Sequence, residues 1–137
     1  MIIIIDSNIL FSALIKDSLT RKLIYETDYD LILPEIVFEE LRKYKEELVR
    51  KTRLSEEEFD KTLRLILKYV RIIPTEQIKH YRNEAWEIIK DHSPEDVMFI
   101  ACALAFDGSI LWSDDKKLKI QNKIKVFDTA EIIIMLK

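Results

Sequence analysis

Four acidic residues stand where a strand should end or where a helix should turn toward the interior: Asp6, Glu40, Asp96 and Asp115. Carboxylates at such places are costly to remove from water unless positive charge compensates them. Several carboxylates at one spot repel one another, and a hard divalent cation with oxygen ligands relieves that repulsion. A bound cation of this kind activates water and stabilises negative charge on a phosphate. The four residues therefore indicate metal-assisted phosphodiester chemistry.

Asp6 directly follows the apolar run at residues 2–5, which has the composition of a buried parallel strand. In open α/β sheets, ligands bind beyond the carboxyl ends of such strands. Asp6, Ser7 and Asn8 are all good helix N-caps, so a purely structural role is the alternative for this segment. The position of Asp6 at the end of an apolar strand favours the functional interpretation.

Glu40 belongs to a segment with helical periodicity. The apolar arc of that helix consists of Ile36, Val37, Leu41, Tyr44 and Leu48. On a helical wheel Glu40 falls inside this arc and its neighbour Glu39 falls outside it. A carboxylate on a buried face needs either a basic residue or a metal ion as its partner. We predict that Glu40 faces the site and that Glu39 faces solvent.

Asp96 ends the segment Ser93-Pro94-Glu95-Asp96, which has the form of a capping box with Asp at its third position. A carboxylate in the first turn of a helix is also stabilised by the helix dipole. Helix capping is therefore the structural alternative for Asp96. The two roles are compatible, because an acid in a first turn can face the edge of a sheet.

Asp114 and Asp115 follow a predicted strand, and Ser113 stands between that strand and the two acids. Adjacent acids after a strand are often only a turn. This pair, however, should lie at the same edge of the sheet as Asp6. We expect one of the two to point into the site and the other to point toward solvent.

Short β-type runs alternate with helical patterns along the chain, which is typical of a parallel α/β sheet covered on both faces. The predicted strands are residues 2–5, 29–33, 70–73, 109–112 and 125–127. The predicted helices are residues 8–16, 17–26, 34–50, 55–69, 74–90, 93–107 and 129–137. Two consecutive helices lie between the second and third strands, so we expect this helical pair to project as an arm or to pack against a partner. We expect one domain, residues 1–137.

Bulk composition excludes several classes of protein. The net charge of -3 over 137 residues argues against a large basic nucleic-acid surface, although metal and local Lys or Arg can still hold phosphate. The single cysteine, Cys102, excludes an internal disulfide and a multi-cysteine metal site, and its apolar surroundings predict a buried, inert thiol. His80 and His92 lack metal-ligand spacing and are expected at the surface. No apolar run is long enough to span a membrane and no signal peptide is evident, so we expect a cytoplasmic protein.

Four segments together resemble the PIN domain family, whose best-known members are toxin–antitoxin ribonucleases of the VapC type. These segments are residues 4–10, 34–41, 96–103 and 111–118. In the family, an Asp after the first strand binds metal, a Glu directly precedes a Leu, and an Asp opens a helix. A further Asp stands two positions after a hydroxyl residue. The matching residues here are Asp6, Glu40, Asp96 and Asp115.

The resemblance implies a three-layer α/β/α sandwich with a mostly parallel five-stranded sheet of order 3-2-1-4-5. It implies an endoribonuclease that uses Mg²⁺ or Mn²⁺ and hydrolyses RNA. Ser7, Asn8 and Ser113 would support the acidic cluster, and Asp114 would occupy a variable position. The family also implies a homodimer and a small antitoxin partner.

Three alternatives are considered. A phosphoacceptor receiver domain needs an acid pair after the first strand and an Asp after the third, where this chain has Pro74 and Thr75. A haloacid-dehalogenase-type phosphatase needs an Asp two positions after Asp6, where this chain has Asn8. The third alternative is a PIN scaffold that binds RNA or a protein partner without cutting. The complete acidic set favours the nuclease.

Overall fold

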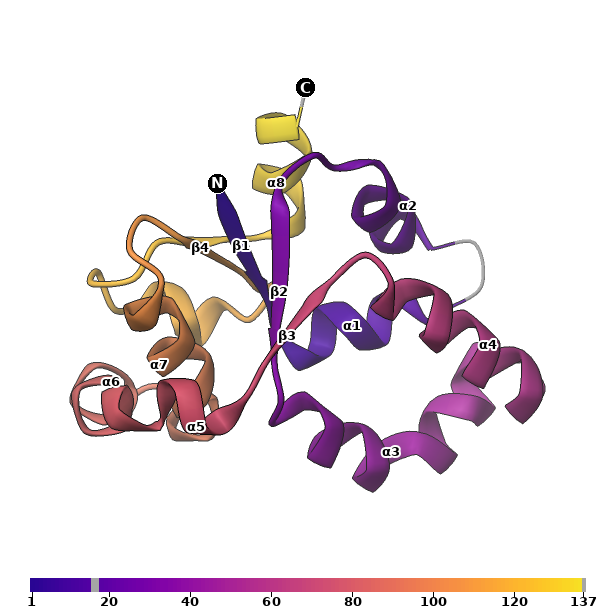
Figure 1. The fold of residues 1–137 in the computed structure, drawn as a ribbon, viewed down its shortest axis with the longest axis horizontal. Coiled ribbons are helices and arrows are strands. Elements are labelled where there is room, and N and C mark those ends of the chain that lie inside the picture. The colour runs from indigo at the N-terminus through magenta and orange to yellow at the C-terminus, as the bar shows by residue number, and fades with distance from the viewer. Residues whose placement is uncertain (16–17, 137) are drawn as a thin grey trace.

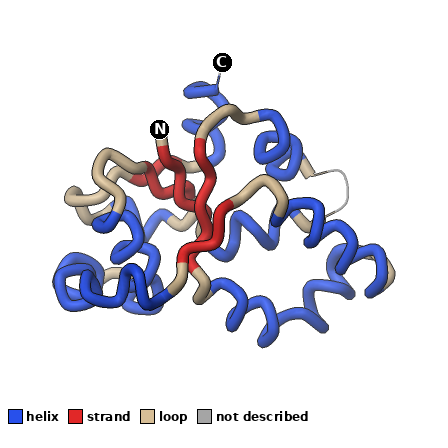
Figure 2. The backbone as a smooth tube through the Cα atoms, viewed as in Figure 1, coloured by secondary structure: helices blue, strands red, loops and turns tan. Residues whose placement is uncertain are grey.

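The computed structural model, which describes residues 1–15 and 18–136, has a five-stranded sheet at its centre (Figures 1 and 2). All neighbouring strands are parallel, and their order is β3-β2-β1-β4-β5. The strands are β1 (Ile2–Ile5), β2 (Asp30–Pro34), β3 (Arg71–Ile73), β4 (Ile110–Trp112) and β5 (Val126–Phe127). The predicted fold class and strand order are confirmed.

The helices cover the sheet on both sides and confirm the three-layer arrangement. Helices α5, α6 and α7 lie on one side of the sheet, and helices α1 to α4 lie on the other (Figure 1). Their bounds are α1 (Ser7–Ala13), α2 (Leu19–Glu26), α3 (Val37–Thr52), α4 (Glu56–Leu67), α5 (Thr75–Ile78), α6 (Arg82–Ile89), α7 (Val97–Ala105) and α8 (Thr129–Leu136). Short 3-10 turns span Lys79–Tyr81, Pro94–Asp96 and Lys116–Lys119.

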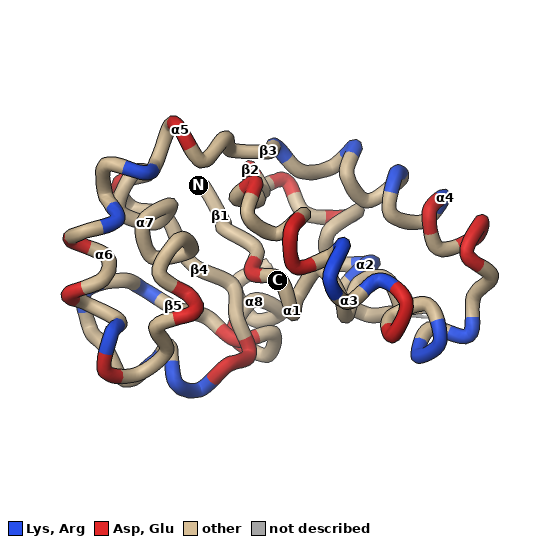
Figure 3. The backbone as a smooth tube through the Cα atoms, turned by 90° about the horizontal axis from the view of Figure 1, so that it is seen from below, with Lys and Arg blue, Asp and Glu red and all other residues tan. Residues whose placement is uncertain are grey.

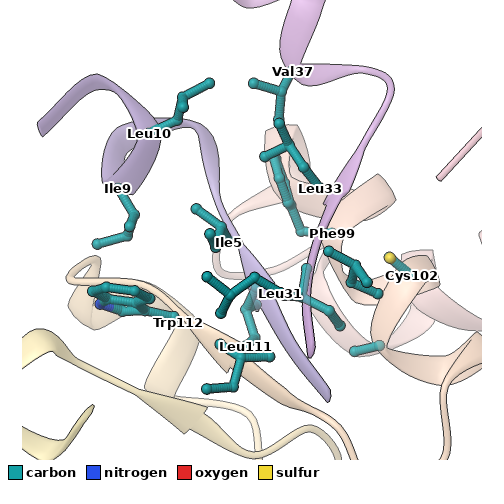
Figure 4. Close-up of a cluster of buried hydrophobic side chains, with 14 of the residues drawn as sticks. Ile5, Ile9, Leu10, Leu31, Leu33, Val37, Phe99, Cys102, Leu111 and Trp112 are labelled. Carbon is teal, nitrogen blue, oxygen red and sulfur yellow. The ribbon is translucent and has the colours of Figure 1, made fainter. Parts of the chain in front are cut away.

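Strand β1 lies at the centre of the sheet, and this position explains its unbroken isoleucine run. It pairs with β2 on one side and with β4 on the other, so that both of its faces are covered. Ile3, Ile4 and Ile5 are all buried. Figure 4 shows Ile5 among side chains of β2, β4 and the flanking helices, including Leu31, Leu111 and Trp112. The core therefore holds the end of β1, and with it Asp6, in a fixed position.

The helical pair α3 and α4, residues 37–67, extends beyond the sheet as an arm (Figure 1). The arm packs back onto the body of the domain, because α3 contacts α1 and α4 contacts α2. Ser55 begins α4 with a complete capping box, in which its hydroxyl accepts from the Glu58 N–H and the Glu58 carboxylate accepts from the Ser55 N–H. The predicted arm and its predicted cap at Ser55 are confirmed.

The start of the third helix was placed wrongly by the sequence pattern. Pro34 suits a first helical turn, but it is the last residue of β2 and pairs with Ile73. The next N–H in the chain, that of Glu35, donates to the Ile73 carbonyl at 2.9 Å. The sheet ladder therefore continues past the proline, which lacks a donor, and α3 begins only at Val37.

Other helix ends agree with the pattern to within a few residues. Ser18 caps α2 through a hydrogen bond from the Arg21 N–H, and the predicted boundary at residues 16–17 lies outside the described residues. The helix predicted for residues 74–90 contains a 3-10 turn at Lys79–Tyr81. After α7 the chain turns at Gly108, whose φ of 75° lies in the left-handed region that glycine accommodates.

Cys102 lies fully buried in α7, as predicted. Burial raises the pKa of its thiol to about 12, which leaves the sulfur protonated and unreactive. No helix in the described part of the chain is long and apolar enough to cross a membrane.

Candidate active site

A hollow of about 280 Å³ opens at the carboxyl-terminal edge of the sheet, where β1, β4, α3 and the start of α7 meet. It is lined by Asp6, Ser7, Asn8, Glu40, Lys43, Tyr44, Glu95, Asp96 and Asp115. All four acids singled out in the sequence therefore face one space, although up to 109 positions separate them in the chain. Of the predicted supporting residues, Ser7 and Asn8 line this hollow, and Ser113 and Asp114 do not.

Asp6 is held rigidly at the bottom of the hollow and is only 3% exposed. Its side chain caps α1 by accepting a hydrogen bond of 2.9 Å from the Ile9 N–H, so the structural role considered for Asp6 is real. Burial raises the pKa of Asp6 to about 7. Hydrogen bonds from Ser113 and Ile9 oppose this rise, and the charges of Asp96 and Asp114 add to it. No described basic residue forms an ion pair with Asp6.

Ser7 follows Asp6 and is also buried. Its hydroxyl oxygen is the one buried side-chain polar atom, among the residues that the structure describes, that has no hydrogen-bond partner. A buried hydroxyl without a partner is costly and requires an explanation. Because Ser7 lines the hollow, a ligand or an ordered water in that space would satisfy it. Asn8, by contrast, is exposed at the edge of the hollow.

Glu40 reaches the hollow from the first turn of α3. It is partly buried, whereas Glu39 is exposed, as the helical wheel predicts. The Glu39 side chain lies on the other side of α3, where it lines a separate space. No described residue forms a hydrogen bond or an ion pair with the Glu40 carboxylate. The Glu40 carboxylate therefore faces the other acids of the hollow, and no described cation forms an ion pair with it.

Asp96 stands at the end of a 3-10 turn and directly before α7. The predicted capping box is wrong, because the Ser93 hydroxyl makes no capping bond to the helix. It donates instead to the carboxylates of Glu95 and Asp96. The tight 3-10 geometry of residues 94–96 replaces the box and turns Asp96 toward the hollow. Burial raises the pKa of Asp96, the Ser93 hydrogen bond lowers it, and Glu95, Asp115 and Glu40 raise it further.

The two acids after β4 point to different places, as expected. Asp115 lines the hollow, and its carboxylate accepts from the Lys117 N–H at 3.0 Å. Asp114 is exposed and binds Thr129 at the start of α8, through the Thr129 N–H at 2.7 Å and its hydroxyl at 2.9 Å. The buried Ser113 hydroxyl accepts from the Asp115 N–H at 3.1 Å. Ser113 and Asp114 therefore position the segment from outside the hollow.

The hollow is also lined by Lys43, Tyr44 and Glu95, which were not predicted to line it. Lys43 and Tyr44 follow Glu40 by three and four positions, which places them on the same side of a helix. That spacing was the available signal, but Tyr44 was assigned to the apolar core and is 40% exposed instead. The two histidines do not line the hollow. His80 is exposed, as predicted, and packs against Tyr81, whereas His92 is partly buried and lines a different space.

The donor atoms of the hollow suit a hard cation, since they are carboxylate, amide and hydroxyl oxygens. The buried, uncompensated Asp6 and the unpartnered Ser7 hydroxyl both fit such an occupant. In the described residues, however, no three acidic, histidine or cysteine side chains lie close enough together to hold a metal ion as they stand. The carboxylates share one space without forming a closed ligand shell.

Comparisons with known proteins agree with the fold. The crystal structure of VapBC2 from Rickettsia felis, bound to a DNA fragment from their promoter, contains a chain with the same fold. Its TM-score is 0.70 at 20% sequence identity, over 93% of this chain and 98% of that chain. A search of curated proteins gave no significant match. The family model described as "PIN domain" matches residues 4–135, and the chain therefore belongs to the PIN domain family.

Proposed function

We propose that this protein is a metal-dependent endoribonuclease that hydrolyses phosphodiester bonds of RNA with Mg²⁺ or Mn²⁺. The observation that carries the proposal is the buried, uncompensated Asp6 in a hollow that it shares with Glu40, Asp96 and Asp115. A buried carboxylate without a basic partner is stabilised by a proton or by a bound cation, and a divalent cation can serve several carboxylates at once. PIN domains are nucleases, and the acids occupy the positions that match the family motifs.

Asp6, Glu40 and Asp96 would bind the metal, and Asp115 would complete the ligand set directly or through water. When bound, the ion lowers the pKa of a water molecule and neutralises charge on the phosphate. The chain contributes a fixed position for Asp6, which is held by the Ile9 N–H and the Ser113 side chain. The Ser7 hydroxyl is placed to donate to an oxygen in the hollow.

Incubation of the purified protein with a pool of RNAs tests this proposal. Cleavage should appear with Mn²⁺ or Mg²⁺, disappear with chelator, and disappear in the Asp6→Asn variant. Asn keeps the side-chain oxygen that caps α1 and removes the charge, so the variant should remain folded. Equal cleavage by Asp6→Asn and the parent would refute the assignment.

A second candidate is a PIN scaffold that binds RNA or a protein partner without cutting. It is favoured by the absence, among the described residues, of three side chains arranged as a ready-made metal site. The same incubation separates the two candidates. Binding of RNA that never leads to metal-dependent cleavage would favour the scaffold.

We further propose that the chain is the toxin of a toxin–antitoxin pair, with a small antitoxin as its partner. The similarity of fold to a chain of a VapBC2 complex supports this role. A homodimer in the cytoplasm is the expected form of such a protein. Sedimentation of the purified chain measures its oligomeric state, and a monomer at micromolar concentration would contradict the proposed dimer.

A further inference from the structure

Tyr44 presents an aromatic ring to the acidic hollow. It lies one helical turn after Glu40 on α3, lines the same hollow and is 40% exposed. No described residue forms a hydrogen bond with its hydroxyl group. The ring contacts a single charged group, the Lys43 ammonium, whose Nζ lies 5.3 Å from the ring centroid. A half-exposed aromatic ring beside a reaction centre offers a surface on which a flat ligand can stack.

Lys43 differs from the other lysine near this space. Lys117 is engaged with acids: its Nζ lies 3.3 Å from Glu95 Oε1 and 3.8 Å from Asp115 Oδ2. Lys43 lines a hollow with five acidic residues, yet its ammonium forms an ion pair with no described carboxylate. Figure 3 shows basic residues directly after the acidic start of α3. The charge of Lys43 is therefore available to an anion that enters the hollow.

This inference rests on the nuclease function proposed above and assigns two residues that would position its substrate. We propose that Tyr44 and Lys43 form a platform for single-stranded RNA, in which the Tyr44 ring stacks on an unpaired base and Lys43 binds an adjacent phosphate. Proteins that bind single strands combine aromatic stacking with positive charge along the backbone. The chain has a net charge of -3, so a local cation at the hollow has to attract the polyanion.

The platform selects against duplex RNA. In an A-form helix both faces of each base are covered by neighbouring bases, and the protein meets only the minor groove and the backbone. A ring at the edge of a hollow of about 280 Å³ can stack only on a base that is free of its own helix. The platform therefore places an unpaired nucleotide beside the phosphate that is to be cut.

Binding measured without cleavage tests the platform separately from the nuclease activity. The assay uses the Asp6→Asn background with Mn²⁺ and a short RNA that carries 2-aminopurine, whose emission falls when it stacks. Tyr44→Ala should weaken binding of the single strand by about tenfold or more and abolish the quenching. Tyr44→Phe and Tyr44→Trp should keep both. Tyr69→Ala is the matched control, because Tyr69 is 51% exposed but lies outside the hollow.

Lys43→Gln should reduce the dependence of binding on salt by about 0.7 in the slope of log K against log salt, the value for one phosphate contact on a single strand. Lys61→Gln on α4 is the control, since Lys61 is exposed and outside the hollow. The duplex of the same sequence should bind more weakly and be indifferent to Tyr44.

The platform would be overturned if Tyr44→Ala bound the single strand as tightly as the protein that keeps Tyr44. It would also be overturned if Tyr44→Phe lost as much affinity as Tyr44→Ala, or if the single strand did not bind at all. None of these results depends on cleavage. If the parent cuts RNA and Tyr44→Ala binds it normally, the platform fails and the nuclease function stands. If the parent never cuts but Tyr44 still governs binding, the nuclease function fails and the platform stands.

Discussion

Two acids of the arm and two acids of the hollow have opposite surroundings. On the arm, Lys45 lies 3.4 Å from Glu56 and 2.9 Å from Asp60, so each of these carboxylates has a cation beside it. In the hollow, Asp6 and Glu40 have no ion pair with any described residue. Neighbouring acids also raise the pKa of Asp6 and of Asp96. Acidic residues thus serve solubility and helix pairing in one region and create an uncompensated charge in the other.

This difference shows why the number of acids alone says little about function. An exposed ion pair contributes little to stability, because water already solvates both charges. A buried carboxylate without a partner costs the folded state free energy that only a ligand or a proton can return. The lack of a partner, more than the presence of acids, marks the hollow as the candidate site.

The largest expected effect is on cleavage and separates adjacent acids of α3. Glu40→Gln should lower the rate of metal-dependent RNA cleavage by at least about a hundredfold, because it removes a carboxylate that would hold the metal ion. Glu39→Gln is the matched control and should leave the rate unchanged, since Glu39 is exposed outside the hollow. Single-turnover rates of the two variants decide the question. Similar rates for both would remove Glu40 from the site.

The second effect is the cost of charging Asp6 in metal-free protein. Its pKa is raised to about 7 in the folded state, so the folded form favours the protonated group. The protonated Asp6 therefore contributes to the free energy of unfolding. This contribution is fully present below the unfolded pKa near 3.8 and is lost as the pH rises through about 7. In chelator, Asp6→Asn should therefore be more stable than the parent at pH 8 by on the order of 4 kcal/mol, and nearly equal to it at pH 4.

Urea unfolding at the two pH values measures this difference. Asp30→Asn is a suitable control, because Asp30 is exposed and already paired with Arg71 at 2.8 Å. If the difference in stability between Asp6→Asn and the parent in chelator is the same at pH 4 and pH 8, the burial of Asp6 carries no such cost.

The third effect is stabilisation by metal. A ligand that binds only the folded state at a hundred times its Kd adds about 2.7 kcal/mol to the free energy of unfolding. We expect Mn²⁺ to raise the melting temperature of the parent and to have much less effect on Asp96→Asn. Differential scanning fluorimetry across a Mn²⁺ titration measures the shift. A melting temperature that rises equally in both proteins would place the binding elsewhere.

The smallest effect tests the arm. Lys45→Gln removes the cation that faces Glu56 and Asp60. Because these side chains are exposed, the melting temperature should stay within about 2 °C of the parent, and the cleavage rate should not change. A clear loss of activity would mean that the arm and the hollow are coupled, and the contrast between them would be weaker than described.

The positions of the strands and the convergence of the four acids on one space were predictable from short, local patterns, whereas the strand order was implied by the resemblance to the PIN domain family. The isoleucine run, the alternation of strands with helices and the acid after each central strand are visible without coordinates. The wheel position of Glu40 also separated it correctly from Glu39. The start of α3 was not predictable in this way, because the ladder from β3 to Glu35 depends on a strand about forty residues later in the chain.

The contacts of Ser93 and the exposure of Tyr44 were also not predictable from the sequence. The segment Ser93-Pro94-Glu95-Asp96 matches a capping box by composition, and only its 3-10 geometry turns the Ser93 hydroxyl toward the acids. Tyr44 has the periodicity of a core residue, and its exposure follows from the way α3 leaves the sheet. Local spacing fixes which side of a helix a residue occupies, but tertiary packing decides what covers that side.

The N-cap of α1 has a consequence for variant libraries. The Asp6 oxygen that accepts from the Ile9 N–H belongs to the same carboxyl group that faces the hollow. A screen scored by protein abundance would accept Asn at this position, whereas a screen scored by turnover would reject it. Ala removes the cap acceptor as well as the charge, so it should score below Asn in the abundance screen and should be rejected in the turnover screen. At position 6, the side chains compatible with folding therefore differ from those compatible with catalysis.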